Sequence, residues 1–305
     1  MTAASSPSAI SQASAHKLFS WRRASAIAGT TFRDLVRQKV FYFMLVFAAI
    51  IIGLSLVLVN LSFRGQLQAV MDVSLGAISV FTLLLAILST AVLLPRDLEE
   101  RTLYTILAKP VSRFEYLLGK LWGVGIMLFV ATALMTALLS IVLYAWQGKE
   151  VSNIMANVEV EKVPQAIAHL KASTFTWKLF AGIGILFLRA MVCAAFTLMI
   201  SSFATSWLFT VVASFMGVLI GHLVPIARAV WLEPMQYGVE VSWYLTAFLR
   251  FVILFPDMQM FNLVDSIAVG DQVPWADFGS AVGMGCGYLA VYTLVAWLFF
   301  AWKEL

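Results

Sequence analysis

The sequence predicts an all-α integral membrane protein with six transmembrane helices. Hydrophobic residues make up 62% of the 305 residues and charged residues 12%, with a mean hydropathy of +0.92. A soluble domain is about half apolar and about a quarter charged, so this chain has too few charged side chains to cover a surface in water. Its apolar residues also form runs of about 20 residues, the length that crosses a bilayer as a helix.

Six apolar runs are long enough to span the membrane. Polar residues follow the first run at Asn60, and Pro95 is predicted to stop the second. The turn at residues 204–206 joins spans four and five and predicts a helical hairpin. The predicted spans cover about residues 40–60, 73–94, 121–146, 179–203, 207–223 and 278–302.

Two segments precede the first span. Residues 1–15 are mostly Ala and Ser, lack apolar periodicity and do not resemble a cleaved secretory signal, so we expect a disordered tail. Residues 16–39 place apolar side chains such as Phe32 and Leu35 among six lysines and arginines. This pattern predicts an amphipathic helix that lies along the membrane interface.

The distribution of lysine and arginine predicts the orientation. Residues 16–39 contain six and the loop 95–120 contains five, Lys303 adds one, and the opposite side has seven over three longer loops. The positive-inside rule places both termini and the loop 95–120 in the cytoplasm, and the loops 147–178 and 224–277 outside. We therefore expect a multi-pass protein of the bacterial inner (cytoplasmic) membrane, in contact with lipid and with no nucleic acid.

The external loop 224–277 contains its own apolar stretch at about residues 241–255. Arg250 interrupts this stretch, and Glu240 and Pro256 bracket it. Charges and proline within so short a run favour interfacial or re-entrant helices between spans five and six. A seventh span is the alternative.

Residues suited to catalysis or metal binding are sparse. The chain has no phosphate-binding G-x-x-x-x-G-K-[ST] loop, no H-E-x-x-H and no G-x-S-x-G. Cys193 and Cys286 lie inside apolar runs, which disfavours a disulfide framework. His16, His169 and His222 lack the spacing of a zinc site. We therefore expect no catalytic residue, no metal and no directly bound cofactor.

Glycines four residues apart indicate where helix backbones approach closely. In lipid, packing rather than hydrophobicity drives helix association, and small residues permit it. The spacing is compatible with two interpretations, general packing within the bundle and a specific dimer seam. These glycines are Gly119 and Gly123, Gly217 and Gly221, and Gly279, Gly283 and Gly287.

Arg189 is a charged residue deep within a predicted span. A charge in the bilayer core is costly, so such a residue is a functional candidate. The alternative is a structural arginine that reaches the interface or pairs with backbone carbonyls. No acidic partner can be named from the sequence.

The loop 95–120 has more pattern than a simple connection requires. Apolar residues recur at helical spacing over residues 98–107, and Asp97 is suited to open a short helix there. Ser112 and Glu115 form a predicted capping box for the helix that leads into span three. A short amphipathic helix between two spans is suited to docking against a cytoplasmic partner.

The same loop resembles the hallmark of ABC-2 type permeases, an acidic residue before [G/R]-T-L, followed by a leucine, [K/S]-P-[V/I]-S-R and G-K. Many members have glycine at the position of Arg101, and the Arg-Thr-Leu form resembles the branch that includes nitrous-oxide-reductase maturation permeases. TTFRDLVRQKVFY, GHL and FPDMQMFNLVD resemble the family's entry helix, fifth-span ending and last external loop. The loop residues that carry the resemblance are Glu99, Arg101, Thr102, Leu103, Leu107, Lys109, Pro110, Val111, Ser112, Arg113, Gly119 and Lys120.

The resemblance implies a six-span permease domain over residues 40–305 with the type V exporter fold. It implies a dimer with a second permease copy or a paralogue, and a separate ABC ATPase subunit that binds ATP and Mg. Residues 96–110 would be the coupling helix. The residues implied at the ATPase interface are Glu99, Glu100, Arg101, Thr102, Leu103, Ile106, Leu107, Lys109, Pro110 and Arg113.

Two other functions stay open on the residues alone. An ion-driven carrier should show inward-facing acids or broken spans at matching positions in two halves, and the sequence has no such repeat. An ATPase-coupled membrane scaffold that transports nothing could use the same loop. Family members handle lipids, polysaccharides, drugs, peptides or metalloenzyme maturation factors, and the resemblance does not select among these substrates.

Overall fold

The computed structural model describes residues 20–59, 66–100, 112–157, 162–232, 243–253, 255–262 and 275–302, and within these ranges the chain is helical throughout apart from short turns. Six helices, α2, α3, α5, α7, α8 and α11, are long and apolar enough to cross a membrane, as predicted. The helices are α1 (Trp21–Val36), α2 (Lys39–Val59), α3 (Gln66–Glu99), α5 (Arg113–Asn157), α6 (Val163–Thr174), α7 (Trp177–Phe203), α8 (Trp207–Leu232), α9 (Trp243–Ile253) and α11 (Trp275–Trp302), with a 3₁₀ turn at Gln259–Phe261.

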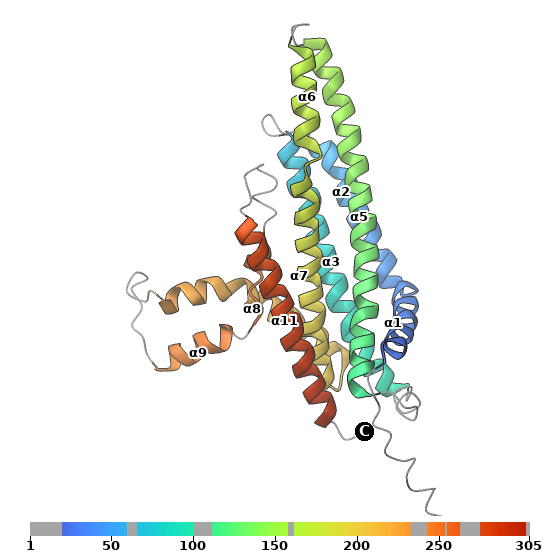
Figure 1. Ribbon diagram of the computed structural model, residues 1–305, viewed down its shortest axis with the longest axis vertical. Coiled ribbons are helices and arrows are strands. Elements are labelled where there is room, and N and C mark those ends of the chain that lie inside the picture. The colour runs from blue at the N-terminus through green and yellow to red at the C-terminus, as the bar shows by residue number, and fades with distance from the viewer. Residues whose placement is uncertain are drawn as a thin grey trace, which may run out of the picture.

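Helix α7 is the central helix of the bundle. It packs against α3, α5, α8 and α11, while α2 lies outside and contacts α3 and α5 (Figure 1). One buried cluster, which includes Leu94, Tyr116 and Phe300, fills the end of the bundle where α3 finishes and α5 begins. A second, which includes Ile52 and Leu143, fills the other end. We call the first end the loop end.

Helix α1 packs lengthwise against the first half of α5. Its buried residues include Ala28 and Thr31, so the side that meets α5 is small rather than bulky. A Cβ atom added to Gly123 would lie 2.6 Å from the Thr31 Cβ and 2.8 Å from the Ala28 carbonyl oxygen, and Gly119 is equally close to α1. The interface helix predicted over residues 16–39 is thus tied to the bundle through this glycine pair.

The helix that contains span two does not end at Pro95, where the apolar run was predicted to stop. Pro95 lies inside α3, which continues to Glu99, and the Glu100 N–H still bonds the Arg96 carbonyl at 2.9 Å. Proline removes one backbone N–H from the helix and crowds the carbonyl four residues earlier, and surrounding groups in a helical bundle can accommodate both effects. Asp97 therefore belongs to the last turn of α3 and does not open a separate helix.

The polar segment predicted as an external loop over residues 147–178 is largely helical. Helix α5 continues beyond the apolar run to Asn157, and α6 returns beside it with a proline in its first turn. The two helices form a hairpin that extends past the bundle at the top of Figure 1. Apolar run length marks the membrane-crossing part of a helix, whereas the helix itself can continue into water.

Helix α9 occupies the apolar stretch predicted at about residues 241–255. Its 11 residues rise about 16 Å, which is too short for a hydrocarbon core of about 30 Å. Figure 1 shows α9 beside the end of α8, with both projecting sideways from the bundle. This arrangement is consistent with an interfacial or re-entrant helix rather than a seventh span.

Candidate functional site

The structure describes the two flanks of the loop that is predicted to couple to an ATPase, residues 95–100 and 112–120. Glu99 and Glu100 are exposed at the end of α3, and the Glu100 carboxylate pairs with Arg96 at 2.7 Å on the surface. The remaining loop residues of the prediction lie outside the described residues. These are Arg101, Thr102, Leu103, Ile106, Leu107, Lys109 and Pro110.

An ion pair joins the two flanks of the loop. The Lys120 ammonium lies 2.6 Å from a carboxylate oxygen of Asp97, and both side chains are mostly buried. The Tyr116 hydroxyl donates to the same carboxylate, and the Lys120 nitrogen lies 5.6 Å from the centroid of the Tyr116 ring. A buried carboxylate needs such a partner and donors to offset its desolvation. The last turn of α3 is thereby fixed to the start of α5.

Glu115 is fully buried and joins α1 to α5. Its carboxylate accepts the backbone N–H of Ser112 at 2.9 Å, and the Ser112 hydroxyl accepts the Glu115 N–H at 3.1 Å. The predicted capping box is therefore confirmed. The same carboxylate accepts the Ser20 N–H at 2.6 Å and pairs with Arg23 at 3.0 Å. One side chain thus caps α5 and anchors α1.

Arg113 connects the loop end to the last helix. Its guanidinium donates to the carbonyls of Phe300 at 3.0 Å and Ala301 at 2.7 Å, where α11 finishes. A cation at these unpaired carbonyls stabilises a helix C-terminus. The Tyr116 ring stacks on Phe300, with ring centroids 5.7 Å apart. The structure gives Arg113 these contacts inside the chain, and its role at an ATPase interface stays a prediction.

These contacts unite four helices at the loop end without forming a catalytic centre. The described residues contain no group of three or more His, Cys, Asp or Glu side chains placed to hold a metal ion. The arrangement can instead hold the flanks of the loop rigid against α1 and α11. Sequence reasoning named Lys120 and Glu115 but missed Arg23 and the pairing role of Asp97, because nothing in the local pattern shows which helices meet.

The glycines predicted at helix contacts divide into two groups. A Cβ atom added to Gly217 would overlap the Phe196 ring, and one added to Gly221 would lie 2.5 Å from the Pro256 carbonyl oxygen, so these two glycines serve packing within the chain. Gly279, Gly283 and Gly287 have no described atom within 4 Å of such a Cβ. The glycine ladder of α11 therefore faces away from its own bundle.

Arg189 lies between three helices. Its guanidinium on α7 donates to the Ser79 hydroxyl of α3 at 3.0 Å and lies 2.9 Å from Nε2 of His222 on α8. The residue is only 9% exposed. The structure thus pairs Arg189 with two side chains instead of the interface or backbone carbonyls considered from the sequence, and the two partners lie 110 and 33 residues away along the chain.

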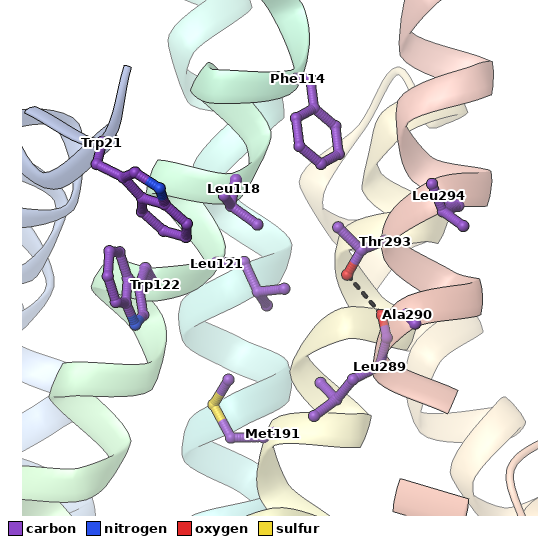
Figure 2. Close-up of a pocket in the computed structure, with 10 residues that line it drawn as sticks. All are labelled: Trp21, Phe114, Leu118, Leu121, Trp122, Met191, Leu289, Ala290, Thr293 and Leu294. Atoms are coloured by element: carbon purple, nitrogen blue, oxygen red, sulfur yellow. Dashed lines mark hydrogen bonds between the residues drawn. The ribbon is translucent and has the colours of Figure 1, made fainter. Parts of the chain in front are cut away.

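An apolar groove of about 570 Å³ opens near the loop end, between α1, α5, α7 and α11 (Figure 2). Trp21 and Trp122 meet edge to face on one wall, with ring centroids 5.4 Å apart. Thr293 carries the only hydroxyl among the lining residues, and it donates to the Leu289 carbonyl of its own helix at 2.6 Å. The groove suits contact with lipid chains and offers no set of polar groups to orient a polar substrate.

Comparison with known proteins gives a match that spans nearly the whole chain. The model of the family described as ABC-2 family transporter protein matches residues 25–305. No curated protein matches the chain. The matched residues include all six candidate spans, from α2 to α11, and the loop 95–120. The chain therefore belongs to the ABC-2 family of transporter proteins, the membrane permease components of ABC transporters.

Proposed function

We propose that this permease subunit exports a substrate with energy from ATP that a separate ABC ATPase subunit hydrolyses. The permease is a transport component and not itself catalytic, and ATP and Mg would bind the partner. The observation that carries the proposal is the Asp97–Lys120 ion pair of 2.6 Å. It fixes both flanks of the loop 95–120 to each other, so a partner that moves this loop would move α3 and α5 together.

The mechanism follows from the contacts at the loop end. Closure of two ATPase subunits around ATP would displace the docked loops. The Asp97–Lys120 ion pair would pass this displacement to α3 and α5 together. Arg113 would pass it to α11 through its hydrogen bonds to the Phe300 and Ala301 carbonyls. Packed helices move as rigid bodies because a close-packed interior does not deform continuously. In this mechanism the exposed charges Glu99 and Glu100 orient the ATPase.

The transporter we propose is a dimer of permeases, with a second copy or a paralogue as partner. The glycine face of α11, formed by Gly279, Gly283 and Gly287, supports a seam because it meets no other described part of the chain. The positive-inside rule favours the bacterial inner membrane with both termini and the loop 95–120 in the cytoplasm. The Arg-Thr-Leu sequence at residues 101–103 favours the branch that resembles nitrous-oxide-reductase maturation permeases.

Affinity purification tests the proposal. The tagged chain is purified in mild detergent and compared with a double charge reversal, Glu100→Lys with Arg101→Glu, followed by identification of bound proteins and an ATPase assay. The matched control is Lys149→Glu with Glu150→Lys, an adjacent opposite-charge pair near the other end of α5. Recovery of an ATPase by the wild type and control, and its loss by the double reversal, would support the proposal.

The absence of any ATPase from all three samples would contradict the proposal and favour an ion-driven carrier. An ATPase that binds all three samples equally would place the docking surface elsewhere. Stimulation of the recovered ATPase by a transported compound would separate a transporter from a scaffold.

A further inference from the structure

Arg189 lies near the middle of the membrane-spanning part of α7. The helix runs from Trp177 to Phe203, so Arg189 stands 12 residues, or about 18 Å, from one end and 14 residues, or about 21 Å, from the other at 1.5 Å per residue. The hydrocarbon core of a bilayer is about 30 Å thick. The charged residue therefore lies near the middle of a helix long enough to cross this core, far from both of its ends.

Both side-chain partners of Arg189 are neutral. His222 Nδ1 lies 2.9 Å from the Val218 carbonyl oxygen, which can only accept, so this nitrogen carries the ring proton. His222 Nε2 is then the acceptor that faces the Arg189 guanidinium at 2.9 Å. Ser79 contributes a hydroxyl oxygen at 3.0 Å. Neither partner neutralises the positive charge.

The charge of Arg189 is not balanced within the described part of the chain. No aspartate or glutamate there forms an ion pair with it, and its Nε–H is buried without a hydrogen-bond partner. A guanidinium has five N–H donors, and the structure supplies two acceptors. An uncompensated cation in the bilayer core is costly, so this site has the electrostatic requirement for an anion.

The cluster lies just beneath the outer surface of the bundle where α3 meets α8. Ser79 and His222 are half-buried, and their neighbours Val80, Leu219 and Leu223 are exposed. A ligand that reaches the seam between α3 and α8 would thus meet Ser79 and His222 first and the guanidinium directly behind them. The exposed neighbours are apolar, which suits the apolar portion of an amphiphile.

We propose that Arg189 binds an oxyanion, a phosphate, sulfate or carboxylate group, of the compound that the permease moves. The planar guanidinium presents parallel N–H donors that match two oxygens of such a group. Ser79 and His222 are positioning residues, because they hold the guanidinium at the seam and leave its charge uncompensated. The transport role rests on the proposed function, whereas oxyanion binding by the chain is independent of any ATPase.

Binding to the purified full chain in neutral detergent tests this site without the ATPase. Native mass spectrometry compares phosphatidylglycerol with phosphatidylcholine of the same chains, and thermal unfolding compares sodium phosphate with sodium chloride at equal ionic strength. The first arm reports a lipid headgroup and the second a free oxyanion. The variants are Arg189→Gln and Arg189→Lys. Arg37→Gln removes one exposed positive charge from the residue that follows α1 and serves as the matched control.

The wild type and Arg37→Gln should bind phosphatidylglycerol roughly tenfold or more tightly than phosphatidylcholine, the range of a hydrogen bond to a charged group, or should be stabilised by phosphate. Arg189→Gln should lose whichever effect is found. Arg189→Lys keeps the charge but not the paired donors and should weaken the effect several-fold, so it decides the outcome if Arg189→Gln does not fold. No oxyanion preference in the wild type, or equal preference in all four proteins, would overturn the proposal.

Discussion

Asp97 and Lys120 form an ion pair of 2.6 Å that joins the last turn of α3 to the first turns of α5. The 22 residues between them contain the loop whose sequence resembles the ABC-2 permease hallmark. Because both partners are mostly buried and Tyr116 also donates to Asp97, the pair fixes the geometry at which the loop leaves the bundle. Its strength can be measured against a surface pair in the same region.

Lys120→Met should lower the thermal stability of the chain in detergent. Removing one partner leaves the Asp97 carboxylate mostly buried without its cation, which costs about 1–3 kcal/mol when another donor remains. Arg96→Gln breaks the exposed Arg96–Glu100 pair and should cost about 0.2–0.5 kcal/mol. Equal losses of stability in the two variants would show that the Asp97–Lys120 pair does not hold the loop end together.

Gly123→Ala should destabilise the contact between α1 and α5. The added Cβ would lie 2.8 Å from the Ala28 carbonyl oxygen, and the backbone cannot rotate away as a side chain can. We expect a cost of about 1–3 kcal/mol from this overlap. Gly148→Ala, on the same helix with no described atom within 4 Å of the new Cβ, should be neutral or should stabilise the helix by up to about 1 kcal/mol.

Thermal unfolding of both variants checks this prediction. Increased proteolysis within α1 in Gly123→Ala alone would locate the loss at the contact with α5. A Gly123→Ala protein as stable as Gly148→Ala would contradict the close approach of the two helices.

Cys286 should cross-link two copies of the chain if the α11 glycine face is the seam of a homodimer. Cys286 is exposed and forms no disulfide within the described part of the chain, and it lies between Gly283 and Gly287 on the same helix. A two-fold axis brings the same surface of both subunits together, so oxidation in membranes should give a disulfide-linked dimer. Cys286→Ser should abolish it, and Gly283→Leu should reduce it because a larger side chain separates the backbones.

The monomer fold gives the control for this experiment. Gly283→Leu should leave the thermal stability of the detergent-solubilised monomer nearly unchanged, because no described atom lies within 4 Å of the added Cβ. The contradicting result is a wild-type chain whose copies associate in the membrane, as co-purification shows, but never cross-link through Cys286. The seam would then lie on another face.

Single cysteines should reveal the predicted orientation. In a chain with Cys193→Ala and Cys286→Ser, Ser152→Cys on the external hairpin should react with a membrane-impermeant maleimide in intact cells. Ser25→Cys on α1 should react only after the cells are opened, because the positive-inside rule places α1 in the cytoplasm. Both side chains are exposed, so accessibility within the protein does not limit either reaction. The reverse labelling pattern would contradict the predicted orientation and show that the chain has the opposite topology.

The sequence alone determined the membrane-crossing elements because these depend on local composition. An apolar run of about 20 residues must bury its backbone polar groups in a helix wherever it meets lipid. Six runs predicted six helices, and all six are present. The Ser112–Glu115 capping box was equally readable because its donors and acceptors lie within one turn of a helix.

The extents of the helices were harder to predict than their existence. Pro95 and the polar residues after Trp146 predicted where spans two and three end, but the helices themselves go further, because α3 continues through Pro95 and α5 reaches Asn157. In both cases the helix survives because neighbouring structure supports it: α3 is held at Asp97 by Lys120, and α5 packs against α6. Local signals report the preference of a segment, whereas packing decides where it stops.

Only the tertiary structure decided which residues meet. Arg189 lies 110 residues from Ser79 and 33 residues from His222 along the chain, and the sequence pattern identified neither residue as its partner. It found all seven paired or laddered glycines by their spacing, yet Gly123 faces α1, Gly217 faces Phe196 and Gly283 faces outward. Spacing fixes which residues share a helix face, and only the packing of the helices fixes what that face contacts.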